Sequence, residues 1–201
     1  MTFRGENGTY LAFLGRIAPE KGLDTAIRVA RQAKQPLHIA ARKPLRHGGD
    51  ANVRADRRHY EREILPLLDR ISTRFVGEVD GAKKDDFLGH ASALLFPIRW
   101  PEPFGLVMVE AMACGTPVIA LRQGSVPEVI EDGVTGFICD DEDEMVDAIG
   151  RIDEIDRSRC RQVAEERFST ERMADEYVDV FETLCAPTAS ERAPRRLWLA
   201  K

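Results

Sequence analysis

Two glutamates, Glu102 and Glu110, are the residues of this sequence best suited to holding a polar ligand. Glu102 lies in a loop that Pro101 and Pro103 keep extended. Glu110 is the only charge in an apolar run from Gly105 to about Cys114, which we expect to form a helix buried nearly all round. A buried carboxylate is neutral, paired with donors or open to a ligand. A core glutamate held by backbone amides or an arginine, and a ligand-binding glutamate, therefore both fit Glu110.

The spacing of these glutamates disfavours hydrolysis of a glycosidic bond. Eight helical residues rise by roughly 12 Å, whereas glycosidases hold their two carboxylates about 5 to 9.5 Å apart. Two anchors on one long ligand fit better, with one carboxylate on a sugar hydroxyl and the other on a ribose hydroxyl. The backbone amides of Phe104, Gly105 and Leu106, at the positive end of the helix, are placed to receive a phosphate or sugar oxygen.

Two cations, Arg16 and Lys21, lie in the segment GRIAPEKG between a predicted strand and a predicted helix. Lys21 next to a helix N-terminus faces the positive end of the helix dipole, and an anion between the two cations would resolve that conflict. The alternative, which this loop by itself favours, is a solvated loop in which Glu20 neutralises both cations. The segment matches neither GxGxxG nor GxxxxGK[ST], so neither a dinucleotide cofactor site nor a P-loop is indicated.

Short branched runs alternate with segments of helical period, which is typical of βαβ units. We therefore predict an α/β fold with a Rossmann-like, doubly wound parallel sheet. The predicted strands are Tyr10 to Gly15, Leu37 to Ala41, Arg74 to Gly77, Ala93 to Pro97, Pro117 to Leu121 and Gly136 to Cys139.

The helices between the strands are predicted from apolar spacing and capping residues. The apolar spacing of Leu23, Ala26, Ile27 and Ala30 predicts the first helix. Further helices are predicted at Asp56 to Ile71 (despite Pro66), at Lys83 to Ala91, after a capping box that begins at Ser125, and along the stripe Met173, Tyr177, Val180, Phe181 and Leu184. We predict one domain over residues 1–186 and a mobile tail over 187–201.

Composition narrows the classes of function. A formal charge of −5 gives no basic footprint for nucleic acid. The four cysteines and four histidines show no metal-ligand spacing, so no metal site is expected. The sequence shows no signal-peptide pattern and no run of transmembrane length, which indicates a cytoplasmic protein.

From Tyr10 to Leu184 the sequence resembles the C-terminal, donor-binding domain of the large retaining glycosyltransferase family that contains bacterial mannosyl- and glucosyltransferases. The resemblance rests on GRIAPEKG, RFVGEV, EPFGLVMVE and EAMACGTPVIA with VPEVIEDGVTGF, in this order. Enzymes of this family have the GT-B fold, which consists of two Rossmann-like domains. The resemblance therefore implies that this chain is one half of a GT-B fold.

The resemblance also assigns roles to residues. It implies that Arg16 and Lys21 bind the diphosphate of a nucleotide sugar and that Glu110 binds the ribose. Glu102 takes the catalytic position, where it orients the donor sugar near the reacting carbon. The base-lining residues implied are Val76, Gly77 and Val79. The family uses no essential metal, because the cations and the helix N-terminus stabilise the leaving diphosphate, and it needs no cofactor beyond the donor substrate.

The implied reaction is transfer of a hexose, from a donor such as UDP-glucose or GDP-mannose, to an acceptor hydroxyl with retained configuration. In relatives an acceptor domain precedes the first strand, whereas nine residues do so here, so we expect that partner domain to be missing from this chain. Peripheral membrane contact of the full enzyme stays open. The alternatives are a non-catalytic nucleotide-sugar-binding module, and a sugar phosphorylase or epimerase of related fold. Arg42 and Ser125 stand where the family often has glycine, which puts the sugar specificity in question.

Overall fold

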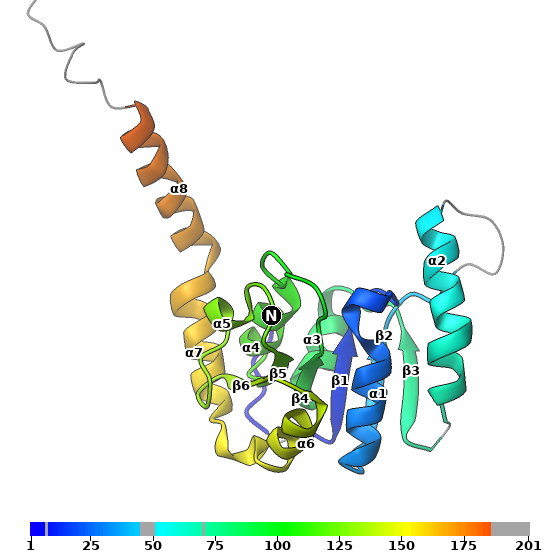
Figure 1. Cartoon of the computed structure of the whole chain (residues 1–201). Coiled ribbons are helices and arrows are strands. Elements are labelled where there is room, and N and C mark those ends of the chain that lie inside the picture. Colours follow the sequence, from blue (N-terminus) through cyan, green and yellow to red (C-terminus); the bar gives the residue numbers. More distant parts are fainter. Residues whose placement is uncertain (7, 45–50, 70, 186–201) are drawn as a thin grey trace, which may run out of the picture. The chain divides into compact units, whose positions relative to one another are not determined.

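The chain forms a six-stranded parallel sheet with the order β3-β2-β1-β4-β5-β6 (Figure 1). The computed structural model describes residues 1–6, 8–44, 51–69 and 71–185. The strands are β1 (Tyr10–Leu14), β2 (Leu37–Ala40), β3 (Thr73–Gly77), β4 (Ala91–Phe96), β5 (Val118–Leu121) and β6 (Gly136–Cys139). All six predicted strands are confirmed, with ends displaced by at most two residues. The predicted doubly wound α/β fold is confirmed as well.

Helices pack on the sheet in two groups. Their bounds are α1 (Leu23–Gln32), α2 (Ala51–His59), α3 (Gly81–Gly89), α4 (Leu106–Ala113), α5 (Val126–Val129), α6 (Glu142–Gly150), α7 (Arg157–Phe168) and α8 (Thr170–Cys185). α1 contacts β1, β2 and α6, and α6 contacts β5 and β6, whereas α3 and α4 contact each other and β4. The apolar stripe predicted for the first helix is buried.

The helix predicted at Asp56 to Ile71 is wrong at both ends. Helical structure begins at Ala51 and runs through α2, a π-helical stretch (Tyr60–Ile64) and a 3-10 turn (Leu65–Leu67). None of the residues of α2 is buried, so this part of the helix has no apolar period from which it could be predicted. The 3-10 turn accommodates Pro66 near its first position, where no helical hydrogen bond from that residue is needed.

The prediction that the helix after Gly105 is buried nearly all round is also wrong. Met108, Ala111 and Met112 are buried, but Leu106 is 68% exposed and the remaining residues are partly exposed. The buried side of α4 faces α3, β4 and β5. An apolar sequence therefore does not guarantee neighbours on every side of a helix.

The short helix after Ser125 is present, but the predicted capping box is wrong. Ser125 has φ −74° and ψ −4°, which is helical rather than the extended conformation of a capping residue, and its side chain makes no capping bond. Its buried Oγ has no hydrogen-bond partner among the described residues. Its backbone carbonyl oxygen instead accepts from the amides of Glu128 and Val129 of α5.

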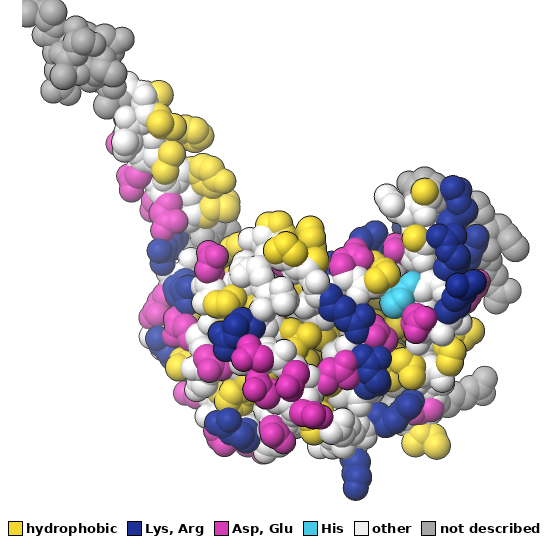
Figure 2. All heavy atoms as spheres, viewed as in Figure 1, with side chains coloured by type: hydrophobic (Ala, Val, Ile, Leu, Met, Phe, Trp, Pro, Cys, Tyr) yellow, Lys and Arg dark blue, Asp and Glu magenta, His cyan; other side chains and the backbone are white. Residues whose placement is uncertain are grey.

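Residue contacts divide the chain into a unit of Met1–Glu166 and a second unit of Arg167–Lys201. Within the second unit α8 is helical as predicted, and its apolar side chains are exposed (Figure 2). The predicted tail over 187–201 lies outside the described residues, and the predicted domain over 1–186 stays a prediction. No described helix is long and apolar enough to cross a membrane. Cys114, Cys139 and Cys160 are buried, whereas Cys185 of α8 is exposed.

Candidate functional site

The glutamate and lysine segments meet at the centre of the sheet. β1 and β4 are neighbours, and the chain leaves β1 toward β2 on one side and β4 toward β5 on the other side. Such a change of direction is where open α/β sheets bind ligands, outside the carboxyl ends of the strands. The loop after β1 (residues 15–22) and the loop after β4 (residues 97–105) both lie at this edge.

Gly22 holds these two loops together. It has φ +69° and ends a 3-10 turn (Pro19–Lys21), directly before α1. A Cβ atom at this position would lie 2.1 Å from the carbonyl oxygen of Pro97, so only glycine permits the contact. Lys21 is thereby fixed against the loop that follows β4.

Lys21 and Glu102 form an ion pair at this junction. The Lys21 Nζ lies 2.5 Å from Glu102 Oε2, although the residues are 81 positions apart in the sequence. The side chains are 24% and 15% exposed, so the pair is shielded but reachable from solvent. The structure thus brings together one member of each predicted constellation.

Arg16 lies on the outer side of the same loop. Its guanidinium pairs with Glu20 and lies 3.2 Å from Asp56 Oδ2 of α2. Because Glu20 pairs with Arg16 while Lys21 pairs with Glu102, the alternative in which Glu20 neutralises both cations is wrong. The Arg16 side chain is 57% exposed, which leaves its other donors available to an anion.

Glu110 lies one helical turn into α4 and is paired with a lysine. Lys84 Nζ of α3 is 2.5 Å from Glu110 Oε1, and the side chains are 26% and 29% exposed. Of the arrangements that fit the sequence, the structure shows a paired carboxylate that solvent can reach. Both site glutamates therefore carry a lysine partner.

The start of α4 lies between the two glutamates. Gly105 caps the helix with φ +74°, and a Cβ atom there would lie 2.6 Å from Met108 Cε. α4 begins at Leu106, so its first N–H groups point out of the helix end, where the dipole favours an anion. Phe104 and Leu106 are both exposed at this end.

Of the three residues proposed to line the base, Val79 borders a pocket beside Arg16. This pocket of about 370 Å³ lies at the carboxyl ends of β1, β2 and β3 and is lined by Leu14, Gly15, Arg16, Ala40, Ala41, Arg42, Glu78 and Val79. Val76 and Gly77 belong to the end of β3 but not to the lining of this pocket. Arg42, one of the two departures from the family pattern, is part of its wall.

The second departure, at Ser125, lies against the Glu102 loop. The Ser125 amide donates to the carbonyl oxygen of Glu102 at 2.9 Å. A Cβ atom on Gly124 would lie 2.4 Å from the Glu102 amide nitrogen. The loop between β5 and α5 therefore packs against the backbone of Glu102.

Arg99 connects the loop after β4 to α1. Its guanidinium donates to Asp24 Oδ2 at 2.5 Å and to Thr25 Oγ1 at 2.6 Å, and its amide donates to the carbonyl oxygen of Glu20 at 2.9 Å. Burial by itself would raise the pKa of Asp24, but hydrogen bonds and charge from Arg99 and Arg28 hold it below its usual value. The two loops are thus joined by side chains as well as by the Gly22 contact.

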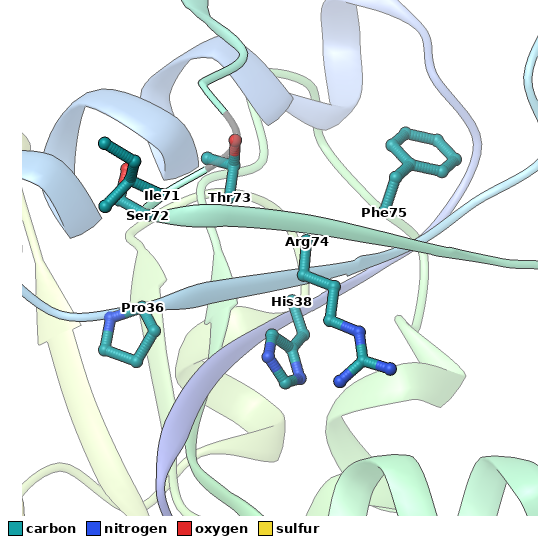
Figure 3. A pocket seen from close by; sticks show the side chains of 7 residues that line it. All are labelled: Pro36, His38, Ile71, Ser72, Thr73, Arg74 and Phe75. Carbon is teal, nitrogen blue, oxygen red and sulfur yellow. The ribbon is translucent and has the colours of Figure 1, made fainter.

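Another pocket lies at the opposite ends of the strands (Figure 3). It measures about 390 Å³ and is lined by Pro36, His38, Ile71, Ser72, Thr73, Arg74 and Phe75. His38 stacks on Tyr10, with ring centroids 3.8 Å apart, and burial followed by the charge of Arg74 lowers the pKa of His38. Because Leu37 and Thr73 begin their strands, this pocket lies at the amino ends of β2 and β3, away from the glutamates. Among the described residues no His, Cys, Asp and Glu side chains cluster as metal ligands.

Sequence reasoning missed three residues of this site, namely Lys84, Arg99 and Trp100. Lys84 precedes the buried Phe87 and Leu88 by three and four positions, a helical spacing that indicates an inward-facing side chain. Arg99 and Trp100 lie in the loop after β4, shortly before Glu102, but no periodicity shows which residues they contact. Trp100 Nε1 donates to Glu102 Oε2 at 2.8 Å.

Comparison with known proteins gives a consistent result. Residues 2–167 match the family model described as glycosyl transferases group 1. The chain is 30% identical over 180 residues to an uncharacterised 41.2 kDa protein of the cps region of Klebsiella pneumoniae, covering 86% of this chain and 46% of that protein. It is 34% identical over 138 residues to a D-inositol 3-phosphate glycosyltransferase of Mycobacterium sp. (strain KMS), covering 67% and 29%. This chain thus spans less than half the length of either relative.

Comparison with solved structures agrees with this result. The crystal structure of Anabaena HepE in complex with UDP and glucose superposes with a TM-score of 0.72 at 21% identity, over 88% of this chain and 49% of that chain. At this identity the likeness shows the fold, which is that of a GT-B glycosyltransferase domain. With the family model covering 2–167, the chain belongs to the glycosyl transferases group 1 family.

Proposed function

We propose that the Met1–Glu166 unit binds the nucleoside-diphosphate hexose from which a retaining glycosyltransferase transfers the sugar to an acceptor hydroxyl. The observation that carries the proposal is the Lys21–Glu102 pair, 2.5 Å apart at the β1–β4 junction and beside the start of α4. Lys21, a cation suited to binding a diphosphate, is therefore in direct contact with Glu102, a carboxylate suited to accepting from a sugar hydroxyl. HepE, of the same fold, was solved with UDP and glucose, which supports a nucleotide-sugar donor.

Each site residue has a role in this proposal. Arg16 and Lys21 bind the diphosphate, together with the amides of Phe104, Gly105 and Leu106 at the positive end of α4. Glu110 accepts from the ribose hydroxyls, and the Val76, Gly77 and Val79 segment borders the base. Glu102 accepts from a hydroxyl of the hexose.

In the proposed donor complex the ion pairs are rearranged. The diphosphate attracts Lys21 away from Glu102, which removes a competing cation from the carboxylate that accepts from the sugar. As the bond between the anomeric carbon and the diphosphate oxygen breaks and the acceptor hydroxyl oxygen bonds to that carbon and gives up its proton, negative charge grows on the leaving diphosphate. Arg16, Lys21 and the α4 amides stabilise that charge without a metal ion or cofactor. UDP-glucose and GDP-mannose are the donors proposed for testing, and the acceptor domain would be supplied outside the unit described.

Calorimetric titration of the chain with UDP, GDP, UDP-glucose and GDP-mannose in EDTA tests this proposal. We expect saturable binding of the ligands of one base. Lys21→Ala and Glu110→Ala should each weaken it about tenfold, since each removes a charged hydrogen bond of about 1.5 kcal/mol. The matched control is Lys83→Ala, an exposed lysine beside Lys84, which should leave the Kd within about twofold.

The other outcomes separate the alternatives. Binding that requires Mg²⁺ would contradict the metal-independent arrangement. Tight donor binding without transfer, when the chain is supplied with both an acceptor and an acceptor domain of the family, would favour the non-catalytic binding module. If the chain binds none of the four ligands, the proposed function is rejected.

A further inference from the structure

Trp100 contacts both members of the ion pair at the centre of the site. Its indole Nε1 donates to Glu102 Oε2 at 2.8 Å, the same oxygen that lies 2.5 Å from Lys21 Nζ. Lys21 Nζ also lies 5.6 Å from the centroid of the indole ring, within cation–π range. The ring is held at this position, although the residue is 39% exposed.

The backbone on both sides of Trp100 is fixed. Arg99 is bonded through its amide to Glu20 and through its guanidinium to Asp24. On the other side the Glu102 amide donates to the carbonyl oxygen of Trp100 at 2.8 Å, which closes a tight turn. The backbone of the loop therefore places the indole beside the Glu102 carboxylate.

The two donors on Glu102 Oε2 differ in what a diphosphate does to them. Lys21 carries a mobile charge on a flexible stem and moves to a stronger anion. The indole N–H is neutral and rigidly attached, so it stays on the carboxylate. This matters because the terminal torsion of a glutamate is soft, and a carboxylate that has lost its only partner turns freely.

We propose that Trp100 is a positioning residue for Glu102: its indole N–H keeps Oε2 fixed when Lys21 moves to the donor diphosphate, so that Oε1 faces a hydroxyl of the donor sugar. The inference rests on the proposed function, because it requires that Lys21 binds the diphosphate and Glu102 the sugar. It adds a residue that controls how well the sugar part of the donor is held. The nucleotide part is left to other residues.

The test compares two affinities of the full chain. Trp100→Phe keeps an aromatic ring but removes the N–H. For the base that binds, the Kd of the nucleoside diphosphate should stay within about twofold of the unaltered chain, whereas the Kd of the nucleotide sugar should rise about tenfold, the usual effect of losing one hydrogen bond to a charged group. A merely structural role would weaken both ligands together. The unchanged diphosphate Kd also shows that the variant is folded.

A double-mutant cycle shows whether Trp100 acts through Glu102. Added to Glu102→Ala, which removes the acceptor, Trp100→Phe should change neither Kd further. Tryptophan fluorescence gives an independent readout in a Trp198→Phe background, where Trp100 is the only tryptophan. The nucleotide sugar should shift the emission further than the diphosphate does.

Each outcome bears on a different claim. Equal weakening of both ligands by Trp100→Phe, or additive effects with Glu102→Ala, would overturn the role of Trp100 and leave the proposed function standing. An unaltered chain that binds no nucleotide would overturn the proposed function, and the inference with it.

Discussion

Substitution of Gly22 by alanine should destabilise the protein far more than the same substitution at Gly133. Both glycines have a left-handed backbone, with φ +69° and +72°. A Cβ atom on Gly22 would lie 2.1 Å from the carbonyl oxygen of Pro97, whereas one on Gly133 would have nothing within 4 Å. The two sites therefore share the backbone strain and differ in the collision.

The magnitudes follow from these two terms. A non-glycine residue in the left-handed region costs about 1 kcal/mol, which applies to both variants. Forcing a methyl group into a filled space costs about 2 kcal/mol more, which applies to Gly22→Ala only. Alanine also restricts the unfolded chain, but equally at the two sites, so that effect cancels in the comparison. We expect losses of about 3 and about 1 kcal/mol in the free energy of unfolding.

Urea denaturation followed by circular dichroism measures both losses, and thermal melting checks them. At about 2 to 4 °C per kcal/mol for a chain of this size, the Tm of Gly22→Ala should lie about 4 to 8 °C below that of Gly133→Ala. Equal midpoints for the two variants would refute the claim that the Gly22–Pro97 contact joins the loops.

Four further substitutions probe three other sets of contacts. Lys84→Met and Glu110→Gln should show a coupling of about 0.5 to 1 kcal/mol in a double-mutant cycle of unfolding, a small value because the pair is partly exposed; strict additivity would show that the pair contributes nothing. Arg157 is buried and donates to three backbone carbonyls, so Arg157→Met should lower the free energy of unfolding by about 3 kcal/mol, and a loss below about 1 kcal/mol would contradict this. Because the folded-state pKa of Asp24 lies below its unfolded value of about 3.9, its stabilisation is present above that pH and disappears as the pH falls through the folded value. Asp24→Asn should therefore destabilise the protein at pH 7 by an amount that shrinks as the pH falls below about 3.9, and a pH-independent difference between the two proteins would argue against the ion pair.

The strands could be predicted from the sequence because each is a short branched run between turn residues. Their bounds differ from prediction only at the ends, where hydrogen bonds to the neighbouring strand decide the last paired residue. The early part of the helix before Pro66 could not be predicted, since α2 has no buried side and hence no apolar period. α4 is less buried than its sequence predicts, because apolar composition shows what a helix can bury but not how many neighbours it has.

The candidate site could be predicted only in part. Glu102 stood out through its prolines and Glu110 through its isolation in an apolar helix, so single residues were recognisable from local context. The pairing of Lys21 with Glu102 was not predictable, because the two residues lie 81 positions apart and meet only through the sheet. Trp100 gave no signal, since its role depends on a turn that places its N–H on the side chain two residues later.

The unequal burial of the four cysteines makes the unaltered chain suitable for single-site labelling. Burial, with nearby acidic groups, raises the pKa of the thiols of Cys114 to about 11 and of Cys139 to about 12, and burial raises that of Cys160 to about 12. A maleimide reacts with thiolate, so these three thiols are protected by both access and protonation. Cys185, exposed at the end of α8, is left as the reactive thiol. A fluorophore attached there without mutagenesis would report on molecules that bind to the apolar side chains of that helix, while Lys21 and Glu102 remain unlabelled.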